Sequence, residues 1–288
     1  KTVNNPRDES QVYALMCEIK VLEKLEKHPN LVNMIGACTT SCNTGRLWLL
    51  LEHCPCGDMK NFLCKNRDVF EKSLHNQDPH KSLNMRLFIK WAYGIAKGMD
   101  YLSSKKIMHG DLAARNILIS TSDRENYLAK ITDFGLSKAF YDKTSYEKED
   151  RRNVPWKWMA VDFLETSIFT MSSDVWSFGV VFWEMLSVGR TPYAGANAND
   201  TIKEIKAGYR LPEPDEISKF QWLIKCYNEV TKMCWHSNPK LRSSFSNLVE
   251  TFEKYLTTEE KEALQRLEKN YAPRYVRDPL YKVNPIGQ

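Results

Sequence analysis

Two short motifs with a predicted β-hairpin between them constrain this chain more than any other feature. The first, residues 109–116, reads HGDLAARN, and the second, residues 133–135, reads DFG. Between them, residues 117–119 and 128–131 are apolar and flank a polar segment, which predicts two short strands joined by a turn. A hairpin of this kind brings the two motifs together, so their side chains are expected to share one site.

The side chains of these motifs suit phosphoryl transfer. That reaction requires metal ions on the phosphates, a carboxylate that orients the nucleophile and takes its proton, and exclusion of water. On this interpretation Asp111 is the base, Asn116 binds Mg²⁺, and Asp133 bridges Mg²⁺ to the triphosphate of ATP. An isolated DFG would be weak evidence, because an Asp before a Gly usually marks a turn. The presence of both motifs in this order is strong evidence for a phosphoryl-transfer site.

The two motifs resemble the catalytic loop and the magnesium loop of protein kinases. The resemblance continues in residues 154–160 (VPWKWMA), 174–179 (DVWSFG) and 234–242, and covers residues 1 to about 255. The LAARN form of the loop and the KWMA segment are typical of tyrosine kinases. Residues 14–18 and 35–39 resemble the receptor group that includes the platelet-derived, vascular-endothelial and fibroblast growth factor receptors.

This resemblance implies an α+β, two-lobed fold with a small β-rich lobe and a larger, mainly helical lobe. We expect the small lobe in residues 1–53, a hinge near 52–57, the larger lobe in 58–255, and a C-terminal helix and tail in 256–288. Hydrophobic residues make up 42% of the chain and charged residues 27%, as in ordinary globular proteins. The net charge of +5 is dispersed along the chain, which argues against a nucleic-acid partner.

The hydrophobic pattern predicts most of the secondary structure. Helices are expected over residues 10–27, 83–104, 172–188, 198–206, 222–234 and 245–256, and a hairpin from residues 31–38 and 47–52. Residues 65–82 are charged and poorly patterned, and are expected to form a surface loop or short insert.

The resemblance also assigns roles to single residues. Lys1 would contact the α- and β-phosphates of ATP and pair with Glu18, and Arg115 would lie near the substrate phenol. The ATP-binding site would further include Leu51, Glu52, Cys54, Leu118 and Asp133. Structural roles would fall to His109, Phe134, Gly135, Asp162, Asp174 and Arg242. Among these, Asp174 would anchor the catalytic loop, and Asp162 would form a buried pair with Arg242.

Several tyrosines are candidate regulatory sites. Tyr141 and Tyr146 fall in the expected activation loop, where neighbouring molecules of this family phosphorylate one another. In the tail, Tyr271 is expected to dock on the protein, whereas phosphorylated Tyr281 would recruit phosphotyrosine-reading adaptor domains. By resemblance, the chain would be the cytoplasmic domain of a plasma-membrane signalling receptor that self-associates.

The chain departs from the kinase pattern in three places. The glycine-rich loop is absent, so we expect a fragment that is a poor enzyme by itself. Gly110 stands where kinases carry a regulatory arginine, and residues 160–162 read AVD in place of APE. Two alternatives therefore stay open. The chain could be a catalytically impaired pseudokinase scaffold, or a small-molecule kinase, some of which share the HGD spelling.

Overall fold

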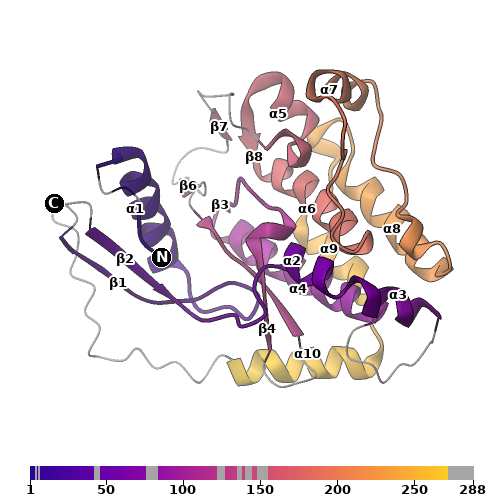
Figure 1. Cartoon of the computed structure of the whole chain (residues 1–288), viewed down its shortest axis with the longest axis horizontal. Coiled ribbons are helices and arrows are strands. Elements are labelled where there is room, and N and C mark those ends of the chain that lie inside the picture. Colours follow the sequence, from indigo (N-terminus) through magenta and orange to yellow (C-terminus); the bar gives the residue numbers. More distant parts are fainter. Residues whose placement is uncertain are drawn as a thin grey trace.

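The chain forms a small lobe and a larger, mostly helical lobe (Figure 1). The computed structural model describes residues 1–3, 5, 7–41, 46–75, 84–121, 127–134, 138–139, 145–147 and 155–271. No helix in these ranges is both long enough and apolar enough to span a membrane.

The small lobe consists of one helix packed on a β-hairpin. Helix α1 (Glu9–Lys24) begins at Asp8, whose side chain accepts hydrogen bonds from two backbone N–H groups of the first turn. Strands β1 (Met34–Ser41) and β2 (Arg46–Leu51) pair antiparallel. The predicted helix and hairpin are therefore both present.

Residues alternate between the two faces of the hairpin as the period of a β-strand requires. In β2, Leu47 and Leu49 are buried against the lobe, while Trp48 and Leu50 are exposed. The first residue of the chain lies alongside this strand, because Leu49 N donates to Lys1 O at 2.8 Å. This pairing holds the Lys1 backbone against the small lobe.

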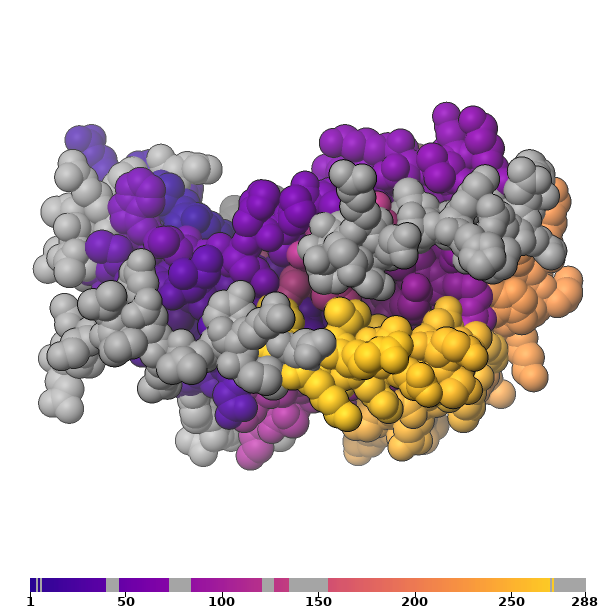
Figure 2. Space-filling model, turned by 90° about the horizontal axis from the view of Figure 1, so that it is seen from below, coloured from indigo at the N-terminus to yellow at the C-terminus, as the bar shows by residue number. Residues whose placement is uncertain are grey.

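The larger lobe contains helices with short antiparallel strand pairs between them: β3 with β6, β4 with β5, and β7 with β8. In chain order its elements are α2 (Met59–Lys65), α3 (Arg67–His75), α4 (Met85–Ser104), β3 (Ile107–Met108), β4 (Ile117–Thr121), β5 (Tyr127–Ile131), β6 (Lys138–Ala139), β7 (Ser145–Glu147), α5 (Val161–Thr166), β8 (Ile168–Thr170), α6 (Met171–Leu186), α7 (Ala198–Lys206), α8 (Gln221–Cys234), α9 (Phe245–Glu253) and α10 (Thr258–Tyr271). Helix α10 crosses the lower side of the lobe in Figure 1, and Figure 2 shows it from below as a yellow band.

Helix α6 forms the core of the larger lobe. It is buried along nearly its whole length, and a capping box between Thr170 and Ser173 begins it. Phe178 and Phe182 of α6 meet Phe252 of α9 edge to face, with ring centroids 5.9 and 5.4 Å apart. The apolar sequence that predicted this helix is explained by contacts on all its sides.

The expectation of a loop over residues 65–82 is wrong for its first half, which forms α3. Phe70 is fully buried and its ring lies 4.9 Å from that of Phe88. Arg67 Nη2 also donates to Val188 O at 2.7 Å. Arg67 also pairs with the buried Glu216 at 3.6 Å. Four of the nine residues of α3 are charged, so the segment resembles a surface loop in sequence. Residues 76–83 lie outside the described ranges.

Helix α6 carries two buried carboxylates, Asp174 and Glu184. Glu184 Oε2 accepts from Ala114 N at 2.9 Å and from Trp158 Nε1 at 2.8 Å. Burial raises the pKa of Glu184 to about 7, against these hydrogen bonds. Burial likewise raises the pKa of Asp174 to about 6, against the attraction of His109 and two backbone hydrogen bonds. These groups tie the centre of the lobe to segments that carry the predicted site.

Burial of Glu184 predicts a pH-dependent stability. Its pKa in the folded protein lies above the ordinary value of 4.5, so between about pH 4.5 and 7 the native state keeps a proton that the unfolded chain has lost. The free energy of unfolding should therefore fall as the pH rises through this window, by on the order of 2–3 kcal/mol from this group. Urea unfolding at several pH values should show this slope, and Glu184→Gln should reduce it.

The exposed Glu250 of α9 provides the control, because Glu250→Gln should keep the wild-type slope. Asp174 remains in both variants and should leave a residual slope up to about pH 6. A Glu184→Gln protein with the full wild-type slope would show that this carboxyl group is not the cause.

Candidate active site

The ammonium group of Lys1 joins the two lobes. Its Nζ lies 2.8 Å from Glu18 Oε2 on α1 and 2.9 Å from Asp133 Oδ1, which follows β5. Glu18 is only 1% exposed, although it is a glutamate on a helix. An ionised carboxylate at such a place requires a charged partner, and Lys1 provides it.

The pKa shifts of this cluster follow from burial and charge. Burial is the largest effect on Lys1 and acts to lower its pKa, but Glu18 and Asp133 together outweigh it and raise the pKa. For Glu18, burial raises the pKa against the attraction of Lys1. Lys1 therefore stays an ammonium ion held between two carboxylates from different lobes.

The loop before β4 gathers the other three predicted catalytic residues. Arg115 Nη2 lies 2.5 Å from Asp111 Oδ1, and Asn116 Nδ2 donates to Asp111 Oδ2 at 2.8 Å and to Asp111 O at 2.7 Å. The Arg115 guanidinium also lies 4.5 Å from the centre of the Trp158 ring. Both carboxylate oxygens of Asp111 are thus held by side chains four and five residues further along the loop.

Buried groups fix the backbone of this loop. Asp174 accepts from His109 N at 2.8 Å and from Gly110 N at 3.0 Å. His109 Nε2 donates to Thr132 O at 3.0 Å, while His109 Nδ1 accepts from Asp111 N at 3.2 Å. The imidazole is therefore fully used in connecting the two motifs. Gly110 has a φ of 80°, a left-handed conformation that favours glycine over the arginine expected here by resemblance.

The second motif lies directly beside the first. Thr132 N donates to Asn116 O at 3.0 Å, and the Phe134 ring lies 5.6 Å from the His109 ring. Asp133 itself has a φ of 65°, which is uncommon for a residue with a side chain and is tolerated best by Asn and Asp. Such strain is characteristic of functional positions.

The donor set of this region suits Mg²⁺ rather than a transition metal. Asn116 and Asp133 offer an amide oxygen and a carboxylate, and Mg²⁺ typically takes one or two carboxylates together with phosphate oxygens and water. Within the ranges that the structure describes, no group of three or more His, Cys, Asp and Glu residues could hold a metal ion. Asn116 and Asp133 therefore fit a magnesium ion whose other ligands would be phosphate oxygens of a nucleotide and water.

The residues predicted to surround adenine lie where the two lobes meet. Leu51 ends β2, and the chain after it pairs with β4, since Asp58 forms an isolated bridge with Leu118. Leu51 and Leu118 are half-buried, and Cys54 is buried, which raises its pKa to about 11. The Glu52 side chain is engaged elsewhere, because Lys130 Nζ lies 3.0 Å from Glu52 Oε1.

The structure describes only part of the segment that was expected to be the activation loop. Arg242 Nη2 forms an ion pair with Asp162 Oδ1, and the Arg242 side chain is fully buried, so the shorter carboxylate of the AVD sequence still reaches its partner. The backbone of Tyr146 pairs with Phe169 in the β7–β8 ladder. Gly135 and Tyr141 lie outside the described residues.

Two features of this region were not predicted as parts of a site. Glu184 accepts a hydrogen bond from the backbone of Ala114. One feature of the sequence could have indicated its role, since it is an acidic residue in a mostly apolar helix. Asn33 and Lys130 both contact Glu52. No feature of the sequence indicates this, because a lysine in a strand and an asparagine in a loop are ordinarily solvated.

Comparison with known proteins agrees with this geometry. A family model for protein tyrosine and serine/threonine kinases matches residues 1–252. Similar curated proteins include a fibroblast growth factor receptor of Ciona intestinalis, 33% identical over 264 residues, which are 90% of this chain and 34% of that protein. The corresponding receptor of Halocynthia roretzi is 33% identical over 269 residues, 89% of this chain and 34% of the relative.

Fibroblast growth factor receptor 1 of Xenopus laevis is 34% identical over 261 residues, 89% of this chain and 30% of the relative. The chain spans about a third of the length of these three relatives. The match to the family model covers most of the chain and includes both motifs of the site. The chain therefore belongs to the protein tyrosine and serine/threonine kinase family.

Proposed function

We propose that this chain is the catalytic domain of a protein tyrosine kinase, which transfers the γ-phosphoryl group of ATP to tyrosine hydroxyls of proteins. The observation that carries the proposal is the position of Lys1 Nζ, within 2.9 Å of carboxylates from both lobes. Lys1, Glu18, Asp111, Asn116 and Asp133 are all present, whereas pseudokinase scaffolds commonly lack at least one residue of this set. The similarity to receptors of the fibroblast growth factor type supports tyrosine as the acceptor.

The proposed roles follow from the contacts. Lys1, positioned by Glu18, would bind the α- and β-phosphates. Asp111, oriented by Arg115 and Asn116, would align the substrate hydroxyl and take its proton. Asn116 and Asp133 would hold Mg²⁺, which when bound neutralises charge on the phosphates.

Leu51, Leu118 and the backbone from Glu52 to Cys54 would form the adenine pocket. Among these positions, the buried Cys54 thiol has its pKa raised by desolvation and so contributes an apolar wall.

A receptor context is part of the proposal. The chain would be the cytoplasmic domain of a growth-factor-type receptor of the plasma membrane, as the names of its relatives suggest. Self-association would allow one copy to phosphorylate Tyr141 or Tyr146 of another. Phosphorylated Tyr281 would then bind adaptor domains, because arginine-based modules recognise extended phosphotyrosine segments.

Asp111→Asn should reduce turnover by about 10²–10⁴-fold, the usual contribution of a general base. Asparagine keeps the shape of the side chain but cannot take a proton. The measurement is steady-state peptide phosphorylation by the full-length protein, together with calorimetric binding of ATP, which should be nearly unchanged. Asp100→Asn, at a carboxylate that accepts from Ser246 Oγ in the larger lobe, is the control and should keep wild-type turnover. Equal turnover in wild type and Asp111→Asn would contradict the assigned base.

Glu18→Gln should impair the use of ATP. Without the buried charge of Glu18, Lys1 has Asp133 as its remaining charged partner and shifts from its position, and a misplacement of about 1 Å can reduce a rate by about 10²-fold. The kcat/KM for ATP should therefore fall by about 10–100-fold. The exposed Glu9 of the same helix offers the control substitution Glu9→Gln, which should be silent. A kcat/KM within about twofold of wild type would mean that Glu18 does not position Lys1.

A further inference from the structure

The last residue of α10 reaches the connection between the lobes. Tyr271 Oη donates to Glu52 Oε2 at 3.1 Å and accepts from Lys130 Nζ at 2.8 Å and from Asn33 Nδ2 at 2.6 Å. A tyrosine hydroxyl has one proton to donate and two lone pairs, so its capacity is filled by these three partners. The docking expected for Tyr271 is thus confirmed, and it takes place on the proposed hinge.

The partners of Tyr271 all hold the same carboxylate. Glu52 Oε1 accepts from Asn33 N at 2.8 Å and from Lys130 Nζ at 3.0 Å. Glu52 N in turn donates to Asn33 O at 3.0 Å. Oε1 is therefore held from two sides by the chain before β1 and by β5, and the hydrogen bond of Tyr271 orients Oε2. All four side chains form one connected network.

The network is partly screened from solvent, so the loss of one of its hydrogen bonds should be destabilising. The Lys130 side chain is 2% exposed, and burial lowers its pKa against the attraction of Glu52. The Lys130 ammonium also lies 4.5 Å from the centre of the Tyr271 ring. Removal of the Tyr271 hydroxyl would leave the buried Lys130 ammonium with one acceptor fewer and the half-buried Glu52 Oε2 without this donor, which is destabilising at a partly buried site.

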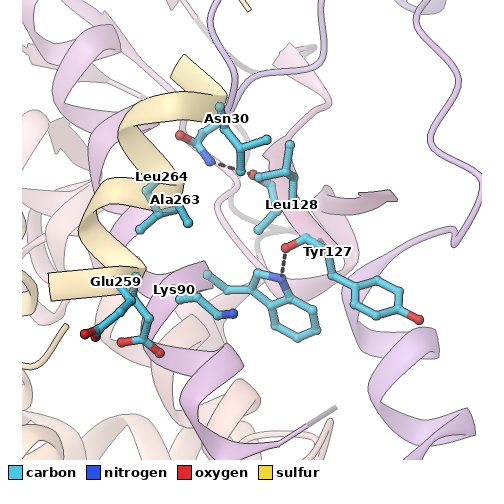
Figure 3. A pocket seen from close by; sticks show the side chains of 11 residues that line it. Asn30, Lys90, Tyr127, Leu128, Glu259, Ala263 and Leu264 are labelled. Carbon is cyan, nitrogen blue, oxygen red and sulfur yellow. Dashed lines mark hydrogen bonds between the residues drawn. The ribbon is translucent and has the colours of Figure 1, made fainter. Parts of the chain in front are cut away.

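Helix α10 is attached to the lobe by polar contacts at separate points and by half-buried apolar side chains, among them Leu264, which packs against the core. Arg86 forms an ion pair with Glu260 near its start, and Lys97 Nζ lies 2.5 Å from Glu268 Oε1 further along. Beneath its first half is a cavity of about 190 Å³, lined by α4, β5 and α10 and shown in Figure 3, so the apolar contact there is incomplete. At the end of α10, the hydrogen bonds of Tyr271 attach the helix to the connection between the lobes.

We propose that Tyr271 is a positioning residue for the nucleotide site. By completing the hydrogen bonds of Glu52, it fixes the backbone from Glu52 to Cys54, against which adenine would bind. The C-terminal helix thereby becomes part of the hinge, and its displacement would weaken nucleotide binding without any change in the residues that contact ATP. This inference rests on the proposed function for the identity of the ligand.

The test is Tyr271→Phe, which removes the hydroxyl and keeps the ring. Calorimetry with Mg²⁺ and the non-hydrolysable ATP analogue AMP-PNP should show a Kd increased by about three- to tenfold, as expected for one lost hydrogen bond. Amides of residues 52–57 should exchange faster with solvent in hydrogen-exchange mass spectrometry. In a Glu52→Gln background the same substitution should have a smaller effect on Kd, because the two residues act together.

Tyr255→Phe is the matched control. Tyr255 Oη donates to Glu229 Oε2 at 2.8 Å in the larger lobe, so this variant loses a comparable hydrogen bond far from the hinge. It should alter thermal stability alone and leave Kd and hinge exchange at wild-type values. Unchanged Kd and unchanged hinge exchange in a folded Tyr271→Phe protein would overturn the inference.

The two proposals fail in different ways. A wild-type protein that binds AMP-PNP but transfers no phosphate would remove the proposed kinase activity and leave the role of Tyr271 intact. If the wild-type protein phosphorylates tyrosine while Tyr271→Phe has the wild-type Kd, the kinase stands and the positioning role is wrong. For a wild-type protein without nucleotide affinity, the hinge exchange of Tyr271→Phe against Tyr255→Phe decides the structural part of the inference.

Discussion

The ammonium ion of Lys1 and its two carboxylates are the interaction on which the site depends. Glu18 is nearly inaccessible to water, and a charge there is stable only with a partner in contact. Because Lys1 also reaches Asp133, the helix of the small lobe, the edge of its hairpin and the motif after β5 are fixed relative to one another. The same geometry provides a positive charge beside a carboxylate, which is what a nucleotide with bound magnesium requires.

Buried acids play the corresponding part within the larger lobe. Asp174 and Glu184, both on α6, accept hydrogen bonds from backbone N–H groups of the loop that carries Asp111. Both carboxyl groups are buried, and this burial raises their pKa values. A rigid helix therefore determines the position of an irregular loop, and the loop in turn presents its carboxylate, arginine and amide side chains in fixed orientations.

Much of this arrangement was predictable from sequence, for identifiable reasons. Helix α1 has an apolar face, helix α6 and strands β4 and β5 are apolar runs, and the motifs beside these strands are distinctive. Helix α3 was missed because, among its side chains that the structure describes (residues 67–72), Phe70 is the buried one. The Tyr271 network could not be predicted, since it joins residues 33, 52, 130 and 271 through hydrogen bonds that leave no periodic pattern. Patterns of apolar residues identify helices and strands, whereas hydrogen bonds between residues far apart in the sequence can be identified only from the three-dimensional structure.

Identification of the phosphorylated amino acid tests the central claim most directly. The full-length protein would be incubated with Mg²⁺, radiolabelled ATP and a peptide pool that contains tyrosine, serine and threonine, and the products would be hydrolysed and separated. The LAARN form of the loop, in which Arg115 contacts Asp111, and the similarity to fibroblast growth factor receptors predict phosphotyrosine as the product, and its loss when the magnesium is chelated. Label only on serine or threonine, or no transfer at all by a protein that binds ATP, would contradict the account.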